Sequence, residues 1–350
     1  MEMLRSLPKA LLHDHLDGGL RPATIVELAD EHGYRGLPTN DVDELAAWFF
    51  QGDSGSLETY LEAFDHTVAV MQSADALERV AFECVADYAA DGIVYGEIRF
   101  GPSLHIGQGL SRHDAIEAVL SGISRGMAET GVVAGVIVTA LRQQGDSLSV
   151  AEAAADFVGS GVVGFDLAGP ERGYPPEAHL AACTVARRAG LGLTIHAGEG
   201  DGAHSIWRAL SLCAAQRIGH GVRIIDETAR DSNGVITKLG PLAARVRDHR
   251  VPLEVSMTSN LHTGMWSAAA EHPVGALHRA GFAVTINTDN RLMSGISLTD
   301  EFATLVDVHG FTTADLLACT TTALESGFGD YEQRRRLLEA VVGPAYREAS

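Results

Sequence analysis

Cysteine is scarce in this chain of 350 residues, which contains only four: Cys84, Cys183, Cys213 and Cys319. They stand far apart and form no C-x-x-C pair, so the sequence excludes a disulfide-rich scaffold and favours a reducing compartment. We expect all four to be core residues.

Long apolar runs are absent as well. The stretch Met1–Pro8 does not combine a basic start with an apolar segment, and no window approaches the ~18 uninterrupted apolar residues typical of a membrane span. We therefore expect a cytoplasmic protein.

Positive charge is in short supply. The 26 Lys and Arg face 46 Asp and Glu, which gives a formal net charge of −20 at pH 7. Nucleic acids and anionic membranes are bound by clustered Lys and Arg, so the sequence argues against both as partners. The expected partner is a small molecule, and the sequence leaves the oligomeric state open.

The composition is otherwise that of a globular protein with a sizeable core, with 46% hydrophobic and 21% charged residues. The length suits one large barrel, a fold that runs to ~250 residues and more with insertions. No linker, low-complexity segment or repeat interrupts the chain. We expect residues 1–350 to form a single domain.

Short apolar stretches alternate with amphipathic helical stretches along the chain. This alternation is typical of parallel strands joined by crossover helices and predicts a single (β/α)₈ TIM-type barrel with extra helices over its C-terminal face. A helical tail from about residue 298 would carry the last barrel helix. The expected strands cover residues 11–17, 93–100, 132–141, 162–167, 191–196, 217–220, 251–256 and 282–287.

Polar side chains stand where five of these strands end, which is where barrel enzymes place their chemistry. A single H-x-H pair can arise by chance, and a lone Asp can be a turn residue. Polar residues at five strand ends together argue for a functional site. The residues are His13, His15 and Asp17 at the end of the first strand, then Asp166–Gly169, His196–Glu199, His220–Gly221 and Asn287–Asn290.

The residue types at these ends suit a catalytic zinc ion. Three imidazoles and one carboxylate, from His13, His15, His196 and Asp289, would bind the metal and leave a position for water. Zinc brings the pKa of bound water near neutrality. His220 is then the candidate base or orienting group, and Glu199 the candidate general acid.

Several motifs resemble those of the adenosine deaminase family within the amidohydrolase superfamily, in the family's order. The stretch Pro8–Gly18 is similar to P-K-x-x-L-H-x-H-L-D-G. The later matches are Gly164–Gly169, Thr194–Glu199, Arg217–Gly221, Glu254–Asn260 and Ile286–Asp289.

The resemblance implies a bacterial-type enzyme with one zinc ion per subunit that converts adenosine or 2′-deoxyadenosine to inosine or 2′-deoxyinosine and ammonia. Glu199 would protonate purine N1, and His220 would activate the water that attacks C6. A backbone N–H at Gly169 would contact the purine and Asp17 the ribose, with His15 also touching the substrate.

The resemblance also implies a hydrophobic gate formed by Leu57, Leu61 and Phe64. Their helical spacing alone indicates core packing, so both interpretations stay open.

This chain departs from the family pattern at Asn290, where many members have a second aspartate that faces purine N7. An amide can donate to that acceptor without being protonated first. Met257 replaces a common proline, and Phe100–Ser103 replaces a more polar run. These changes leave the substrate's identity open.

Alternatives remain. The nearest is a deaminase of a related 6-aminopurine, such as adenine or aminodeoxyfutalosine; Asp17 favours a nucleoside, and no Arg/Lys cluster favours AMP. A two-metal barrel hydrolase would need a lysine at the end of the fourth strand, whereas Lys9 and Lys238 are the only lysines. A cytidine-deaminase-type site would need P-C-x-x-C. A non-catalytic purine-binding barrel would not need Glu199 or His220.

Overall fold

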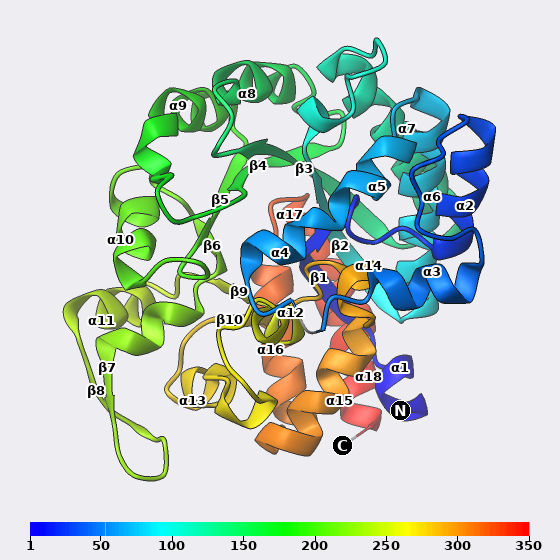
Figure 1. Cartoon of the computed structure of the whole chain (residues 1–350). Helices are drawn as coiled ribbons and strands as arrows, with labels where there is room; N and C mark the ends of the chain where they lie inside the picture. The colour runs from blue at the N-terminus through cyan, green and yellow to red at the C-terminus, as the bar shows by residue number, and fades with distance from the viewer. Residues whose placement is uncertain (53, 350) are drawn as a thin grey trace.

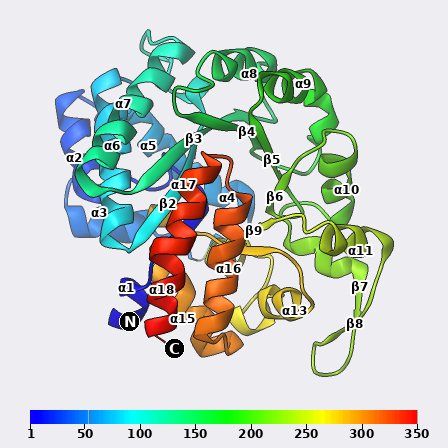
Figure 2. The same cartoon turned by 180° about the vertical axis from the view of Figure 1, so that it is seen from behind.

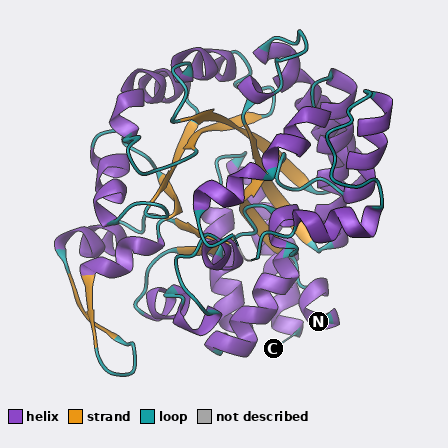
Figure 3. Cartoon of the chain, in the orientation of Figure 1, coloured by secondary structure: helices purple, strands orange, loops and turns teal. Residues whose placement is uncertain are grey.

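The computed structural model describes residues 1–52 and 54–349. Eight strands form one sheet in the order β1-β2-β3-β4-β5-β6-β9-β10, and every neighbouring pair is parallel. The predicted (β/α)₈ barrel is confirmed (Figures 1 and 3). The strands are β1 (Lys9–His15), β2 (Ile93–Phe100), β3 (Val133–Leu141), β4 (Val162–Ala168), β5 (Gly192–Ala197), β6 (Arg217–His220), β9 (Leu253–Val255) and β10 (Val284–Ile286).

The first and last strands meet at the predicted site. The Asp289 N–H donates to the His13 carbonyl at 3.0 Å, and the His15 N–H donates to the Asp289 carbonyl at 2.7 Å. Nearby, the side-chain oxygen of Asn287 accepts hydrogen bonds from the backbone N–H groups of Leu12 and His13, at 2.9 and 3.0 Å. The bonds that join β1 to the end of β10 therefore also fix the backbone of the candidate ligands.

Helices with well-formed ends connect the strands. In α7, for example, Ser111 and Asp114 form a capping box and Gly131 ends the helix in the left-handed region at φ 78°. The α-helices are α1 (Glu2–Ser6), α2 (Pro22–Glu31), α3 (Val42–Phe49), α4 (Leu57–Glu62), α5 (Phe64–Val70), α6 (Ala74–Ala90), α7 (Arg112–Thr130), α8 (Ser147–Ala155), α9 (Leu180–Ala189), α10 (Ala203–Ser211), α11 (Pro241–Asp248), α12 (Met257–His262), α13 (Val274–Arg279), α14 (Arg291–Ser294), α15 (Leu298–His309), α16 (Thr313–Ser326), α17 (Tyr331–Leu337) and α18 (Gly343–Glu348). Short 3₁₀ or π segments are η1 (Pro102–Leu104), η2 (Pro176–His179), η3 (Val222–Glu227), η4 (Ala269–Glu271) and η5 (Leu338–Val342).

Extra helices cover the two ends of the barrel. On the side of the C-terminal strand ends, α4 and α5 lie across the barrel (Figure 1), as predicted. At the other end, seen in Figure 2, lie the tail helices α16 and α17. Phe328, between these two helices, lies against the beginnings of β4 and β5. A Cβ on Gly192 would lie 2.1 Å from the Phe328 ring and one on Gly164 2.8 Å, so glycine is needed at both positions.

A two-stranded hairpin was not anticipated from the sequence. Strands β7 (Thr228–Arg230) and β8 (Ile236–Leu239) pair antiparallel and project from the barrel wall (Figure 3). Within the described residues, no helix is long and apolar enough to cross a membrane.

Candidate metal centre and active site

Five side chains predicted from the strand ends converge at the C-terminal face. One ligand atom from each of His13, His196, His220 and Asp289 lies within 4.8 Å of the other three. The fifth side chain is His15, whose Nε2 lies 3.2 Å from the Nε2 of His196 and 3.4 Å from Asp289 Oδ1. All five groups can therefore reach a common centre.

Two of these residues have an uncommon backbone conformation. His220 has φ 58° and Asp289 has φ 61°, in the left-handed region that side-chain-bearing residues rarely adopt. His220 is the last residue of β6, and Asp289 lies three residues after the end of β10. Such strain persists where the surrounding structure enforces it, and it is common at functional sites.

The donor arrangement fits a metal ion. The Nδ1 atom of His13 lies 3.0 Å from Glu254, and that of His196 lies 3.1 Å from Asp166. A carboxylate holds the hydrogen on Nδ1 and leaves the Nε2 lone pair facing the centre, which is how ligand histidines are oriented. The His13 Nε2 is buried and has no hydrogen-bond partner among the described residues.

The two supporting carboxylates share one cation. Arg99 lies 3.3 Å from Asp166 and 2.8 Å from Glu254, and all three side chains are fully buried. Burial acts to raise the pKa of each carboxyl group. Neighbouring groups outweigh this effect: His196 and Arg99 hold the pKa of Asp166 well below its usual range, and Arg99 and Arg217 do the same for Glu254. Both groups are therefore ionised acceptors.

A cavity of about 240 Å³ opens beside the cluster. The three predicted gate residues, Leu57, Leu61 and Phe64, all line it. Phe64 also packs against the hydrophobic core. Other predicted residues that line it are Asp17, Gly169, Glu199 and Asn290, together with His15, His196, His220 and Asp289.

Two side-chain oxygen atoms in the lining of this cavity lack a hydrogen-bond partner among the described residues. Oδ1 of Asp17 and Oδ1 of Asn290 are both buried without a hydrogen bond among the described residues. Burial raises the pKa of Asp17 to about 7. Unpaired buried polar atoms are costly, so this lining suits a ligand that offers hydrogen-bond donors.

Glu199 is held at the cavity wall by a loop with a buried support. Its Oε2 lies 3.5 Å from Nε2 of His220. The carboxylate of Glu171 accepts the backbone N–H groups of Gly198, Glu199 and Asp201 at 2.7, 3.0 and 2.9 Å. One side chain thus fixes the backbone of this loop at three residues.

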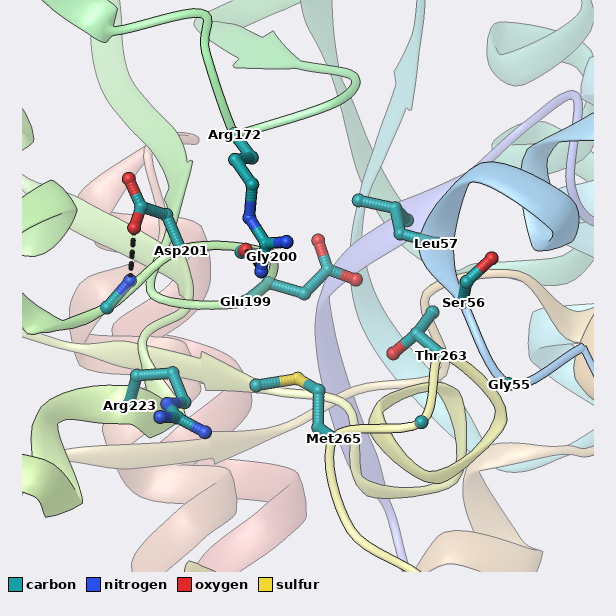
Figure 4. Close-up of a pocket in the computed structure, with 12 residues that line it drawn as sticks. Gly55, Ser56, Leu57, Arg172, Glu199, Gly200, Asp201, Arg223, Thr263 and Met265 are labelled. Atoms are coloured by element: carbon teal, nitrogen blue, oxygen red, sulfur yellow. Dashed lines mark hydrogen bonds between the residues drawn. The ribbon is translucent and has the colours of Figure 1, made fainter.

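A second cavity, of about 410 Å³, lies beyond Glu199 (Figure 4). Its lining includes the loop around Gly200, Arg172 and Arg223 on one side, and Ser56 and Met265 on the other. Glu199 and Leu57 line both cavities, so the carboxylate stands at their boundary.

The sequence-based prediction missed the supporting residues. Arg99 and Glu254 did carry a signal, because a charged residue inside an apolar strand must find a partner when it is buried. Glu171 lies in a loop and carried no such signal. Tyr60 of α4 was also missed, because the prediction for this helix considered only its apolar gate residues. The Tyr60 hydroxyl lies 2.9 Å from that of Ser294.

A parallel barrel with a buried histidine–aspartate cluster at the carboxyl ends of its strands, next to a cavity, is the arrangement of a metal-dependent hydrolase. The family model described as adenosine deaminase matches residues 8–344. The chain belongs to the adenosine deaminase family.

Curated relatives match over almost the whole chain. Adenosine deaminase 1 of Streptomyces coelicolor is 49% identical, over 99% of this chain and 89% of its own length. The adenosine deaminase of Mycobacterium marinum is 48% identical, over 99% and 97%.

Among solved structures, an adenine deaminase from Arthrobacter aurescens superposes with a TM-score of 0.85 at 25% identity, over 98% of this chain and 99% of its own. An amidohydrolase from Burkholderia ambifaria with bound Zn gives a TM-score of 0.87 at 23% identity, over 99% and 92%.

Proposed function

We propose that this protein catalyses the zinc-dependent hydrolytic deamination of adenosine and 2′-deoxyadenosine, giving inosine or 2′-deoxyinosine and ammonia. Full-length relatives at 49% and 48% identity that are named adenosine deaminases support this substrate. The observation that carries the proposal is geometric: Glu199 and His220, 3.5 Å apart, line the same cavity as His15, His196 and Asp289.

The proposed zinc ligands are His13, His15, His196 and Asp289, with one ion per subunit. Carboxylates already orient the imidazoles of His13 and His196. The Nε2 atoms of His15 and His196 lie only 3.2 Å apart, which suits two ligands of one cation. When bound, zinc lowers the pKa of a coordinated water to near neutrality.

The remaining roles belong to side chains around the cavity. Glu199 is 8% exposed and can deliver a proton to purine N1, which avoids negative charge on the ring as C6 is attacked. His220 orients the attacking water. The unpaired Asp17 oxygen can accept a ribose hydroxyl, and the Gly169 N–H can meet the purine edge.

The gate residues Leu57, Leu61 and Phe64 would exclude bulk water from the bound purine, which strengthens every polar contact inside. We propose that residues 1–350 act as one domain in the cytoplasm. The buried free thiols of the four cysteines in the described chain suit a reducing compartment.

Adenine and aminodeoxyfutalosine remain alternative substrates. The structural neighbour named an adenine deaminase is 25% identical, whereas the relatives named adenosine deaminases are 49% and 48% identical. A buried carboxylate placed for a sugar also favours a nucleoside over a free base.

The test is ultraviolet absorbance of purified protein mixed with adenosine, 2′-deoxyadenosine, adenine, AMP and aminodeoxyfutalosine, before and after chelation. Turnover of the two adenosine nucleosides that stops on chelation and returns with zinc is expected. Turnover of none of them by metal-replete protein contradicts the proposal, and activity that survives complete metal removal contradicts the zinc mechanism.

A further inference from the structure

The buried histidines His13, His196 and His220 differ in the group that their Nδ1 atom contacts. For His13 and His196 the partner of Nδ1 is a carboxylate, which can only accept. For His220 the partner is the side-chain amide of Asn260, at 3.0 Å. The direction of that one hydrogen bond decides which nitrogen of His220 carries the hydrogen.

A backbone N–H group fixes this direction from outside the site. The N–H of Val274, at the start of α13, donates to Nδ1 of His272 at 3.2 Å. A backbone N–H can only donate, so this Nδ1 holds a lone pair. Burial, and then the charge of His309, lower the pKa of His272 to about 3, so the ring is neutral and its hydrogen lies on Nε2.

The next two contacts follow from the first. Nε2 of His272 lies 3.2 Å from Oδ1 of Asn260, and the N–H there donates to that oxygen. The amide of Asn260 therefore presents its NH₂ group to Nδ1 of His220. A flipped amide would set two donors against each other at His272. Asn260 and His272 are 0% and 3% exposed, so water does not replace these contacts.

We infer that Asn260 and His272 are positioning residues that fix His220 as the Nε2–H tautomer, so that it faces the reacting water as a hydrogen-bond donor and does not coordinate the metal. This inference rests on the proposed function for the identity of the reaction, but the tautomer itself does not.

The inference separates His220 from the other members of the cluster. An imidazole nitrogen that carries a hydrogen has no lone pair for a metal, whereas His13 and His196 present lone pairs. Although a ring nitrogen of His220 lies within 4.8 Å of the ligand atoms of His13, His196 and Asp289, this tautomer excludes His220 as a ligand. Its Nε2–H instead points to the space bordered by Glu199, 3.5 Å away, where it can hold the oxygen of the attacking water.

The direct test is the nitrogen spectrum of zinc-loaded wild-type protein labelled with ¹⁵N-histidine, with the His220 signals assigned by their loss in His220→Gln. We expect Nδ1 without a hydrogen and Nε2 with one. Protonation at Nδ1 overturns the inference. No substrate is needed, so this result is independent of whether the protein deaminates adenosine.

The second test is Asn260→Asp, which keeps the shape but replaces the donor by an acceptor and should move the hydrogen of His220 to Nδ1. We expect kcat for adenosine to fall at least ~100-fold, with KM within about threefold of wild type and metal content unchanged. The matched control is Asn233→Asp, the same change on the exposed hairpin, which should leave kcat, KM and the His220 signals unaltered.

Undiminished kcat in Asn260→Asp, or an unchanged His220 tautomer, would overturn the inference. If that variant does not fold, the wild-type spectrum decides alone.

Discussion

Nδ1 of His13 and Oε2 of Glu254 lie 3.0 Å apart inside the barrel, and neither side chain is exposed. The same carboxylate also contacts Arg99 at 2.8 Å and Arg217 at 2.7 Å. The orientation of a proposed metal ligand is thus tied to a buried group of charges that no ligand or solvent molecule reaches.

Glu254→Gln should therefore weaken metal binding. A glutamine can turn its NH₂ toward Nδ1 of His13, which moves the ring hydrogen to Nε2 and blocks the lone pair. Loss of such a supporting partner lowers metal affinity by about 10- to 100-fold. Competition with a chromogenic chelator measures it, and Asp166→Asn should act in the same way through His196. Affinity within about threefold of wild type in both variants would contradict this role.

The site residues that the sequence predicts and those that it misses are brought into place by different features of the fold. His13, His15, His196, His220 and Asp289 could be found because parallel strands end at one face of a barrel, so the chain order alone brings them together.

The partners of these residues could not be named from the sequence. Glu254 and Arg99 lie on β9 and β2, and their contact depends on the barrel's register and closure rather than on any spacing in the chain. The hairpin β7–β8 was missed because its strands are short and mostly exposed, without the apolar run that identified the barrel strands.

Glu199→Gln should separate metal binding from chemistry. The variant keeps the side chain's size but cannot deliver a proton to purine N1, so turnover of adenosine should fall at least ~100-fold. Zinc content, measured by atomic emission, should stay at the wild-type level because Glu199 is not among the proposed ligands. Near-normal turnover would remove Glu199 from the mechanism.

Glu171→Gln should slow the reaction through Glu199. The carboxylate accepts three backbone N–H groups of the Gly198–Asp201 loop, whereas a glutamine offers one oxygen and turns its NH₂ toward a donor. Misplacing a catalytic group by ~1 Å can cost about 100-fold, so we expect kcat to fall by about 10- to 100-fold while KM changes little.

A double variant tests that this effect passes through Glu199. Glu171→Gln added to Glu199→Gln should cause little further loss, because the loop then has no acid to position. Glu177→Gln is the control: it removes a carboxylate from the same β4–α9 connection, where Glu177 forms an ion pair with Arg208 at 3.5 Å. Fully additive losses in the double variant would argue for a general structural role.

Tyr60→Phe should loosen the helix over the cavity. The Tyr60 hydroxyl of α4 lies 2.9 Å from that of Ser294 in α14. This contact joins α4, the helix over the cavity and here called the lid, to the segment that follows Asp289. A hydrogen bond contributes about 1 kcal/mol, so we expect KM for adenosine to rise by up to about fivefold with a smaller change in kcat. Ser294→Ala should do the same, and the two changes together should do no more. Independent, multiplying effects on KM would show that this bond is not what closes the lid.

Glu301→Gln should change how stability depends on pH. Glu301 of α15 is fully buried; Oε1 accepts the Thr258 N–H at 2.9 Å, and Oε2 has no partner among the described residues. Burial raises its pKa from 4.5 to about 7. Between these values the folded protein binds more protons than the unfolded chain, so this group lowers the free energy of unfolding as pH rises through that range.

The total change from this group is on the order of 3 kcal/mol and levels off above about pH 7. Glutamine is neutral throughout, so the variant should gain stability relative to wild type as pH rises. Urea unfolding at about pH 5 and about pH 8 measures it, with Glu325→Gln on the exposed face of α16 as the matched control. If the difference between Glu301→Gln and wild type is the same at both pH values, Glu301 is ionised in the folded protein across the whole range, and the Thr258 N–H alone offsets its burial.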